Sequence, residues 1–148
     1  MQKIRLTKEF SFETGHALLN YDGLCKNLHG HSYKLLITII GVPNEDSTSP
    51  KYGMVVDFGD IKQIVDEYVI SKYDHSILVN KMLGEENIDA LKKITERVIV
   101  TDKQPTCENM LINIVEIIKN KLPDYISLHS AKLYETATSY AEWYQSDN

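Results

Sequence analysis

The sequence predicts a single α+β domain, in which one four-stranded antiparallel sheet carries two helices on one of its faces. Strand-like stretches lie near both ends of the chain, and two amphipathic helical stretches lie between them. The resulting order, strand–strand–helix–helix–strand–strand, is typical of α+β domains rather than of alternating parallel units. A chain of 148 residues is long enough for one such domain with one core.

The first two strands are predicted from apolar side chains at alternate positions. Residues 3 to 13 alternate between polar and apolar, as in a half-buried strand. His16 continues the parity of the apolar set, although Gly15 is able to break the register. Residues 17 to 28 form a loop, and the second strand runs from about His31 to Val42. Apolar residues on both faces of this second strand predict burial on both sides.

The two helices are predicted from apolar residues at helical spacing and from their N-caps. Asp57 begins the first helix, which ends near residues 71 to 73. A short extended segment, Gly53 to Val56, precedes it. Thr106 begins the second helix and Pro123 ends it.

The last hairpin is predicted at residues 128 to 135 and 140 to 144. Residues 81 to 104 are the least regular part of the chain, and residues 85 to 98 within them have the pattern of a short helix. We expect this segment to be an insertion in one domain that spans residues 1 to 148. A four-stranded sheet leaves two exposed edges, which proteins often protect by pairing between subunits, so an oligomer is expected.

Composition excludes several classes of partner. The net charge of −5 predicts no basic surface for nucleic acid, and no apolar run is long enough to span a membrane. The N-terminal residues alternate polar and apolar side chains and lack the apolar core of a signal peptide. Two cysteines without such a signal predict reduced thiols in a cytoplasm.

Three of the five histidines, His16, His29 and His31, lie within sixteen positions. In a strand, residues two apart point to the same face, so His29 and His31 are able to hold one ion, and Gly30 between them leaves the opposite face clear. Three imidazoles and an open position are typical of catalytic zinc. Two alternatives remain open at this point. The histidines are unrelated polar residues, or Cys25 is a fourth ligand that closes a structural site.

Other residues are candidates for proton transfer. Cys25 lies four positions before His29, and a thiolate beside a cation has a depressed pKa, which makes it a usable base; the alternative is a small buried hydrophobe. Asp74 and His75 pair an acid with an imidazole at a predicted helix end. This pair is able to shuttle a proton, or it has only a local role at the helix terminus.

Further candidates concern substrate binding. Glu135 has the parity of the apolar side of its strand, where a carboxylate is rare unless it is paired or binds something. The two oxygens of the Glu135 carboxylate would accept hydrogen bonds from the edge of an amidine-like ring that carries two N–H donors. Glu108 lies in the first turn of the second helix, where the helix dipole alone favours a carboxylate. Cys107 is a second thiol without ligand-like neighbours, and His129 has the pattern of an ordinary strand histidine.

Taken together, these residues resemble the 6-pyruvoyltetrahydropterin synthase superfamily. Each motif is weak alone, but six of them in order over nearly the whole chain are specific. The departures are the insertion at 81 to 104 and Cys107, where a small residue is expected. The motifs are Phe12-x-x-x-His16, Cys25-x-x-x-His29-Gly30-His31, Val56-Asp57-Phe58, Asp74-His75-x-x-Leu78-x-Asn80, Pro105-Thr106-x-Glu108-Asn109 and Glu135-Thr136-x-Thr138-Ser139-x-Ala141-Glu142.

The resemblance implies the tunnelling fold, in which subunits pair their sheets into a β-barrel and barrels stack, commonly as a hexamer with active sites at subunit interfaces. It implies a pterin triphosphate substrate, 7,8-dihydroneopterin triphosphate. The roles that it implies are Zn²⁺ binding by His16, His29 and His31, proton abstraction by Cys25, a proton relay through Asp74 and His75, pterin binding by Glu135, and further substrate contacts by Thr106 and Glu108.

Within the superfamily, the chain is most similar to the 6-carboxytetrahydropterin synthases of queuosine biosynthesis, because only three residues separate Cys25 from His29. That branch releases triphosphate and acetaldehyde and leaves 6-carboxytetrahydropterin. The alternatives are a 6-pyruvoyltetrahydropterin synthase, which stops at triphosphate elimination, and a non-catalytic zinc-stabilised module. Phosphate-binding residues are not evident: the chain has only two arginines, Arg5 and Arg97, so lysines or a neighbouring subunit must help.

Overall fold

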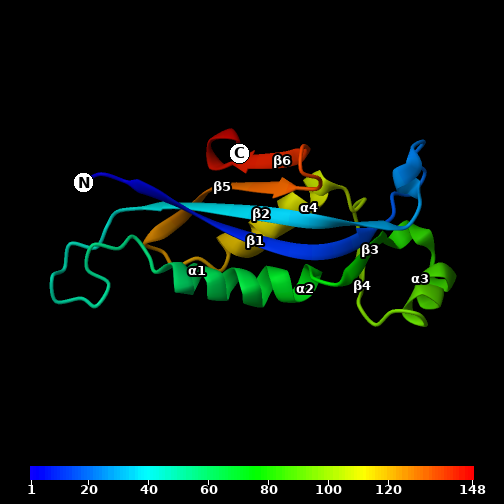
Figure 1. Ribbon diagram of the computed structural model, residues 1–148, viewed down its shortest axis with the longest axis horizontal. Coiled ribbons are helices and arrows are strands. Elements are labelled where there is room, and N and C mark those ends of the chain that lie inside the picture. Colours follow the sequence, from blue (N-terminus) through cyan, green and yellow to red (C-terminus); the bar gives the residue numbers. More distant parts are fainter.

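The computed structural model describes residues 1–148 and contains one six-stranded sheet, in the order β4-β3-β1-β2-β5-β6 (Figure 1). β1 (Ile4–His16) and β2 (His29–Gly41) form the first antiparallel hairpin, and β5 (Ile126–Tyr134) and β6 (Tyr140–Tyr144) form the second. β5 pairs with β2 and joins the hairpins. The predicted α+β class and its four antiparallel strands are confirmed.

The sheet is wider than predicted, because two short parallel strands extend it beyond β1. β3 (Ser76–Asn80) pairs with the end of β1, and β4 (Val98–Thr101) pairs with β3. β3 directly precedes residues 81–104 and β4 lies within them, and their four or five residues are too few for a clear alternation. The predicted helix at 85–98 is shorter: α3 spans Glu85–Lys92, and the rest leads into β4.

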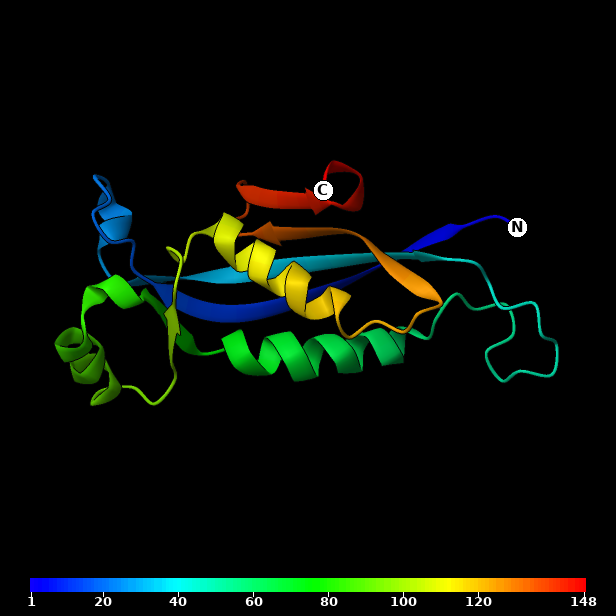
Figure 2. The same cartoon turned by 180° about the vertical axis from the view of Figure 1, so that it is seen from behind.

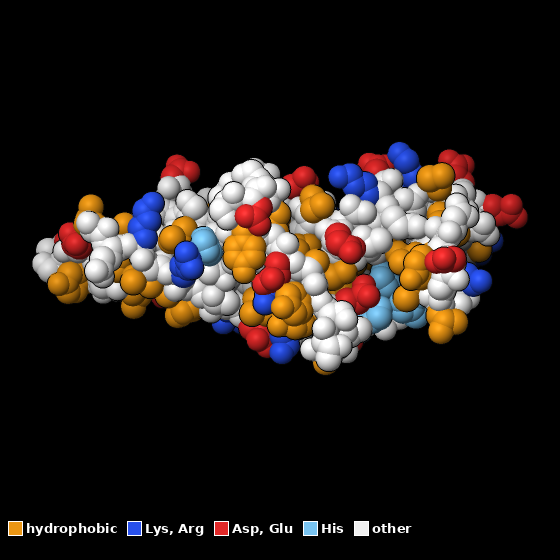
Figure 3. Space-filling model, turned by 90° about the horizontal axis from the view of Figure 1, so that it is seen from above, with side chains coloured by type: hydrophobic (Ala, Val, Ile, Leu, Met, Phe, Trp, Pro, Cys, Tyr) orange, Lys and Arg blue, Asp and Glu red, His pale blue; other side chains and the backbone are white.

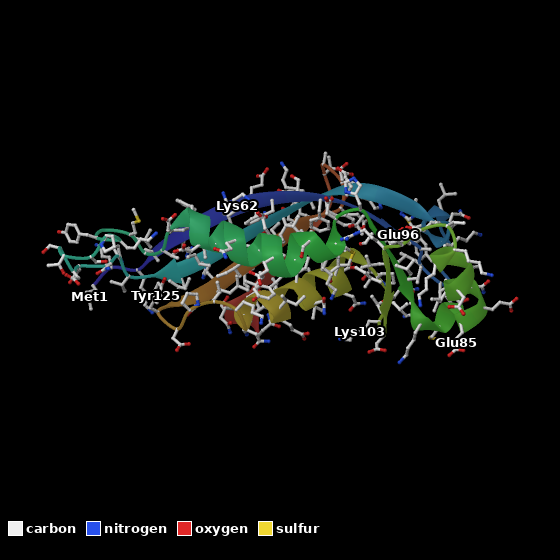
Figure 4. The ribbon with its side chains drawn as sticks, turned by 90° about the horizontal axis from the view of Figure 1, so that it is seen from below. Met1, Lys62, Glu85, Glu96, Lys103 and Tyr125 are labelled. Carbon is white, nitrogen blue, oxygen red and sulfur yellow. The ribbon has the colours of Figure 1, made fainter.

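One layer of two helical segments covers one face of the sheet. α1 (Phe58–Val65), a π-helical stretch (Asp66–Ile70) and α2 (Ser71–Tyr73) follow one another without a break and form one rod, and α4 (Cys107–Lys119) is the second segment. Figure 2 shows both on the same face, and Figure 4 shows them side by side, with Lys62 on the outer surface of the rod. None of the helices is long and apolar enough to cross a membrane.

The predicted helix starts are confirmed by their caps. The Asp57 carboxylate accepts a hydrogen bond from the Gly59 amide at 2.8 Å, and the Thr106 hydroxyl accepts one from the Asn109 amide at 3.3 Å. The extended segment expected before Asp57 forms no strand. Val55 and Val56 are buried in the core all the same.

The core lies between the sheet and the helices, and the other face of the sheet carries no covering layer. That open face is mostly polar: Thr7 and Thr38 share a hydrogen bond of 2.8 Å, and Ser32 donates to Glu13 at 2.7 Å. β2 is therefore fully buried on one side only, and Leu36 on the open side is half-buried, against the expected burial of both sides. The largest fully buried core side chains are Tyr33, Phe12, Leu35, Ile37, Ile39, Leu78, Ile114, Ile118 and Leu133.

Candidate functional site

The register of the first hairpin brings the three predicted histidines together. His16 is paired with His29 across β1 and β2, and His31 follows two residues later on the same face. Their ligand nitrogens lie within 4.8 Å of one another. Gly15 and Gly30 are opposite one another, and β1 continues through Gly15 without a break in register. A Cβ at Gly15 would lie 3.3 Å from the His29 carbonyl oxygen, so glycine permits the close pairing beside the site.

Backbone carbonyls orient two of the imidazoles. His16 Nδ1 lies 2.7 Å from the Pro105 oxygen, and His29 Nδ1 lies 2.7 Å from the Asn27 oxygen. Because a carbonyl only accepts, both Nδ1 atoms carry their hydrogens, and both Nε2 atoms present lone pairs in the neutral rings. These Nε2 atoms are 3.1 Å apart. Two lone pairs at that distance need a proton or a cation between them, and the arrangement is that of metal-binding histidines held by carbonyls.

His31 supplies the strongest sign of a metal centre. Its Nε2 atom is buried and has no hydrogen-bond partner, and the nearest carboxylate oxygen, Glu135 Oε1, is 3.9 Å away. Buried polar atoms are nearly always partnered, so an unpartnered imidazole nitrogen aimed at two others fits a bound ion. Cys25 does not belong to this group of ligand atoms. The donor set therefore fits a three-histidine centre that leaves a coordination position open.

Burial also favours the form of histidine that binds metals. His16 is 1% exposed. Its desolvation lowers the pKa of the ring, with a smaller contribution from His29 and His31, while the Pro105 carbonyl and Glu135 act in the opposite direction. The ring is thus held neutral near pH 7, as a metal ligand must be.

Glu135 and Tyr33 form the wall beside the histidines. Glu135 directly follows β5, and its Oε2 atom accepts a hydrogen bond from the Tyr33 hydroxyl at 3.4 Å. Burial, followed by the charge of Glu135, raises the pKa of Tyr33, so the hydroxyl stays a donor. Its ring stacks on Phe12 with centroids 5.3 Å apart. Tyr33 was not predicted as a site residue, although it continues the parity of His29 and His31.

The site opens to the surface on one side. Figure 3 shows histidine side chains gathered near one end of the molecule, bordered by acidic and hydrophobic side chains. Glu135 and His31 are half-buried, with 26% and 17% of their side chains exposed. Parts of the His31 and Glu135 side chains therefore lie at the surface, while the Nε2 atom of His31 is buried beneath it.

Cys25 lies in the loop between β1 and β2, residues 17–28, which we call the Cys25 loop. It occupies a 3₁₀ turn, Leu24–Lys26, and is half-buried. The Leu18 amide donates to the Cys25 carbonyl at 3.0 Å and closes the loop on itself. The thiol is thus on a surface loop next to the site, with no strand or helix holding it.

Cys107 has a different environment. Its Sγ donates to the Leu133 carbonyl at 3.3 Å, beneath α4. Burial raises the pKa of this thiol to about 11, so it stays protonated at neutral pH. Cys107 is a packing residue in this structure.

Asp74 and His75 form a pair that has no hydrogen bond or ion pair to the three histidines. The Asp74 carboxylate accepts from the Glu13 amide at 2.9 Å and pairs with His75 Nδ1 at 3.0 Å; the Glu13 amide, with a smaller contribution from His75, lowers the pKa of Asp74. His75 adopts a left-handed backbone conformation with φ of 56° and leaves 74% of its side chain exposed. No hydrogen bond or ion pair joins this pair to Cys25 or Glu135 within the chain.

The remaining predicted residues lie at the start of α4. The Thr106 hydroxyl caps the helix, as described above, and Glu108 is exposed in its first turn. Arg97, considered for phosphate, donates instead to the carbonyls of Ser71, Lys72 and Asp74 at the end of α2. The structure thus joins His16, His29, His31 and Glu135 into one site, and Cys25 lies on the loop that connects His16 to His29.

Comparison with known proteins agrees with this architecture. The sequence model of the 6-pyruvoyl tetrahydropterin synthase family matches residues 5–146. Proteins named 6-carboxy-5,6,7,8-tetrahydropterin synthase are similar along most of their length. The one from Haemophilus influenzae is 33% identical over 94% of this chain and 97% of its own. The one from Synechocystis is 32% identical over 93% and 90%.

Solved structures show the same fold. The 6-pyruvoyl tetrahydropterin synthase of Caenorhabditis elegans superposes with a TM-score of 0.67 at 22% identity, over 97% of this chain and 96% of its own. The enzyme of that name from Plasmodium vivax superposes with a TM-score of 0.69 at 19% identity, over 98% and 99%. The half-barrel sheet with its helices on one side is therefore the tunnelling fold.

Proposed function

The chain belongs to the 6-pyruvoyl tetrahydropterin synthase family, and we propose that it is a zinc-dependent 6-carboxytetrahydropterin synthase. In this proposal it converts 7,8-dihydroneopterin triphosphate and water to 6-carboxytetrahydropterin, acetaldehyde and triphosphate, in queuosine biosynthesis in the cytoplasm. The names of relatives at 28% to 33% identity support the carboxy product. The short gap between Cys25 and His29 supports it as well.

One observation carries the proposal. The Nε2 atom of His31 is buried and unpartnered, the ligand atoms of His16, His29 and His31 lie within 4.8 Å of one another, and the Glu135 carboxylate beside them suits a pterin ring. Three imidazoles with an open position favour Zn²⁺. Zn²⁺, when bound, stabilises negative charge on substrate oxygens and acidifies the adjacent C–H bond.

The chain's own residues supply the proton transfer and the binding. The Cys25 thiolate accepts the proton from the substrate carbon, and the released electron pair moves into the pterin ring, so no nicotinamide cofactor is needed. Glu135 binds the amidine-like edge of the ring through its two carboxylate oxygens, and the Tyr33 hydroxyl keeps it oriented. In this proposal Thr106 and Glu108, at the start of α4, contact the outer part of the substrate.

Asp74 and His75 enter the site from a neighbouring subunit in this proposal. Their exposure, and the absence of a hydrogen bond or ion pair between them and Cys25 within one chain, support an assembly, since an exposed pair is available to a second chain. The polar open face of the sheet supports a barrel whose interior it lines, and the hexamer is the assembly we propose. Lysines of the adjoining subunit would bind the triphosphate, because Arg97 is engaged within its own chain.

The test is incubation of the purified, zinc-containing protein with 7,8-dihydroneopterin triphosphate and identification of the products. Release of acetaldehyde together with 6-carboxytetrahydropterin is the expected result. Triphosphate release without acetaldehyde would assign the pyruvoyl reaction instead. No consumption of this substrate by a zinc-loaded oligomer would refute both.

A further inference from the structure

We infer that Gln104 is a positioning residue, whose side-chain amide holds the Cys25 loop against the metal centre. The inference rests on the proposed function, in which Cys25 is the base. It concerns a residue outside the six sequence motifs, at the end of the 81–104 insertion.

Gln104 makes the one hydrogen bond that ties the Cys25 loop to the chain outside the β1–β2 hairpin. Its Nε2 atom donates to the Leu19 carbonyl at 2.7 Å. Every other hydrogen bond of the loop stays within the hairpin, including the bond from the Leu18 amide to the Cys25 carbonyl and that from Asn27 to Leu24. The loop is therefore anchored to the helical layer at a single side chain.

Gln104 is itself held in place. Its carbonyl oxygen accepts from the Asn109 side chain at 2.9 Å and from the Thr106 amide at 2.8 Å. The next residue, Pro105, provides the carbonyl that binds His16 Nδ1. Gln104 and Pro105 thus hold the Cys25 loop and the His16 ring, respectively. Because these two residues are consecutive, the loop and the ring are fixed relative to each other.

Hydrogen bonds around β4 fix the backbone that leads to Gln104. β4 pairs with β3, the Asn80 side chain donates to the Asp102 carbonyl at 3.3 Å, and the Thr101 hydroxyl donates to the Lys103 carbonyl at 2.7 Å. The backbone is therefore fixed up to the residue before Gln104. We assign to the end of the insertion the task of supporting the Cys25 loop.

The hydrogen bond from Gln104 holds Leu19, and the preceding residue, Leu18, donates its amide to the Cys25 carbonyl. Gln104 is thus connected to Cys25 through Leu19 and Leu18. Loss of the Gln104 side-chain amide leaves the Leu19 carbonyl without this partner and weakens the hydrogen bond between the Leu18 amide and the Cys25 carbonyl. A base misplaced by about 1 Å lowers a rate by about 10²-fold, whereas His16 keeps its Pro105 carbonyl and so keeps its orientation. The expected defect is in proton abstraction, with metal binding intact.

The experiment compares Gln104→Ala and Gln104→Glu with the natural protein. Glutamate has the same length but cannot donate to the Leu19 carbonyl when ionised. Gln63→Ala is the matched control, since Gln63 is exposed on α1 and makes no side-chain hydrogen bond. The quantities measured are kcat and KM, zinc content, amide hydrogen exchange at Leu18, and the rate at which iodoacetamide alkylates Cys25.

Both Gln104 variants are expected to lower kcat by about 10- to 10²-fold with a smaller change in KM, and to retain zinc. The Leu18 amide should exchange faster and the alkylation rate of Cys25 should change, while Gln63→Ala matches the natural protein. A variant that loses thermal stability but keeps full kcat at low temperature would overturn the inference, since a merely structural role predicts that result. Should Gln104→Ala fail to fold, the Glu variant decides in the same way.

Failure of the proposed function is distinguishable from failure of this inference. An inactive natural protein would refute the pterin reaction, yet Leu18 exchange and Cys25 alkylation would still report whether Gln104 holds the loop. Faster exchange in both variants supports the anchor, and unchanged exchange and alkylation overturn it.

Discussion

At the residue scale, the proposed chemistry depends on how three imidazoles and two thiols differ in their surroundings. His16 and His29 each give one nitrogen to a backbone carbonyl, and His31 has a buried nitrogen with no protein partner. Cys25 is on the loop that connects His16 to His29, whereas Cys107 is the first residue of α4 and its thiol donates to the Leu133 carbonyl on β5. The three predictions that follow use these differences.

Replacing His31 with alanine should release the metal and leave the fold intact. Its Nε2 atom makes no hydrogen bond to the protein, so its removal costs binding rather than folding contacts. Elemental analysis should report about one zinc per chain in the natural protein and a clear loss in the variant. His129→Ala, on β5 away from the three-histidine group, is the control and should retain zinc. Undiminished zinc in alanine variants of all three ligands would rule out the metal centre.

Replacing Cys25 with alanine tests whether this residue is the general base or a structural metal ligand. We expect zinc and the oligomer to persist and turnover to fall by about 10²–10⁴-fold, the usual effect of losing a positioned general base. The two quantities to measure are the rate of acetaldehyde release and the metal content. Cys107→Ala is the control variant and should keep nearly normal turnover. Zinc lost from the Cys25 variant would make that residue a ligand. Near-normal turnover would leave His75 as the next candidate base.

The two thiols should also differ in their response to pH. Since the pKa of Cys107 is raised to about 11, its neutral thiol persists at pH 8 and its alkylation should accelerate only as the pH rises toward that value. Cys25, on its surface loop, should be alkylated first at pH 8. Mass spectrometry of peptides after iodoacetamide treatment gives both rates. Equal rates at pH 8 in the folded protein would contradict the burial argument.

At the element scale, Arg97 stabilises the end of the first helical rod. Its guanidinium donates to the carbonyls of Asp74 at 3.1 Å and Lys72 at 3.3 Å, and also to Ser71. A cation at a helix C-terminus satisfies carbonyls that have no partner within the helix and interacts favourably with its dipole. The turn that carries Asp74 and His75 follows directly, so Arg97 links the insertion to this pair.

Arg97→Ala should therefore lower the free energy of unfolding by about 1 kcal/mol. Urea unfolding measures it, with Arg5→Ala as the matched control, because Arg5 is exposed on β1 and makes no side-chain hydrogen bond or ion pair. A loss in Arg97→Ala no larger than that in Arg5→Ala would show that the helix end does not depend on the guanidinium.

At the scale of the whole molecule, the proposal that Cys25 and His75 meet at one site from different subunits makes the assembly testable. If the two residues belong to different chains at one site, Cys25→Ala and His75→Ala variants should complement each other. Random mixing in an oligomer leaves about a quarter of the sites with both groups. Turnover of the mixture should then approach about a quarter of the natural value, although each variant alone is nearly inactive. Mixtures no more active than their components would place both groups in one chain.

Light scattering at micromolar concentration provides the complementary measurement. We expect a particle larger than a dimer, because both sheet edges and the polar face opposite the helices are open in the single chain. A monomer would remove the basis for a site shared between subunits.

The sequence alone determined the two hairpins, both helix starts and the identity of the three clustered histidines. Local rules suffice for these features: alternation predicts strands, Asp57 and Thr106 are good caps, and the spacing of His29 and His31 puts them on one face. The same rules predicted β1 only as far as residue 13, yet pairing of Gly15 with Gly30 carries it on to His16. Continuation across a glycine depends on the partner strand, which alternation within one segment does not report.

Only the tertiary structure decided how distant segments complete the site. β3 and β4 are too short to be recognised from their own pattern. β3 forms because the end of β1 offers it hydrogen bonds, and β4 forms because β3 then offers its other edge. The Pro105 carbonyl on His16, the Tyr33 hydroxyl on Glu135 and the Gln104 amide on Leu19 join residues 85 or more positions apart. Such contacts depend on the packing of α4 against the sheet, and backbone carbonyls carry no sequence signal. The local sequence therefore identifies the three histidines as candidate metal ligands, while the packing of the fold sets the orientation of their rings.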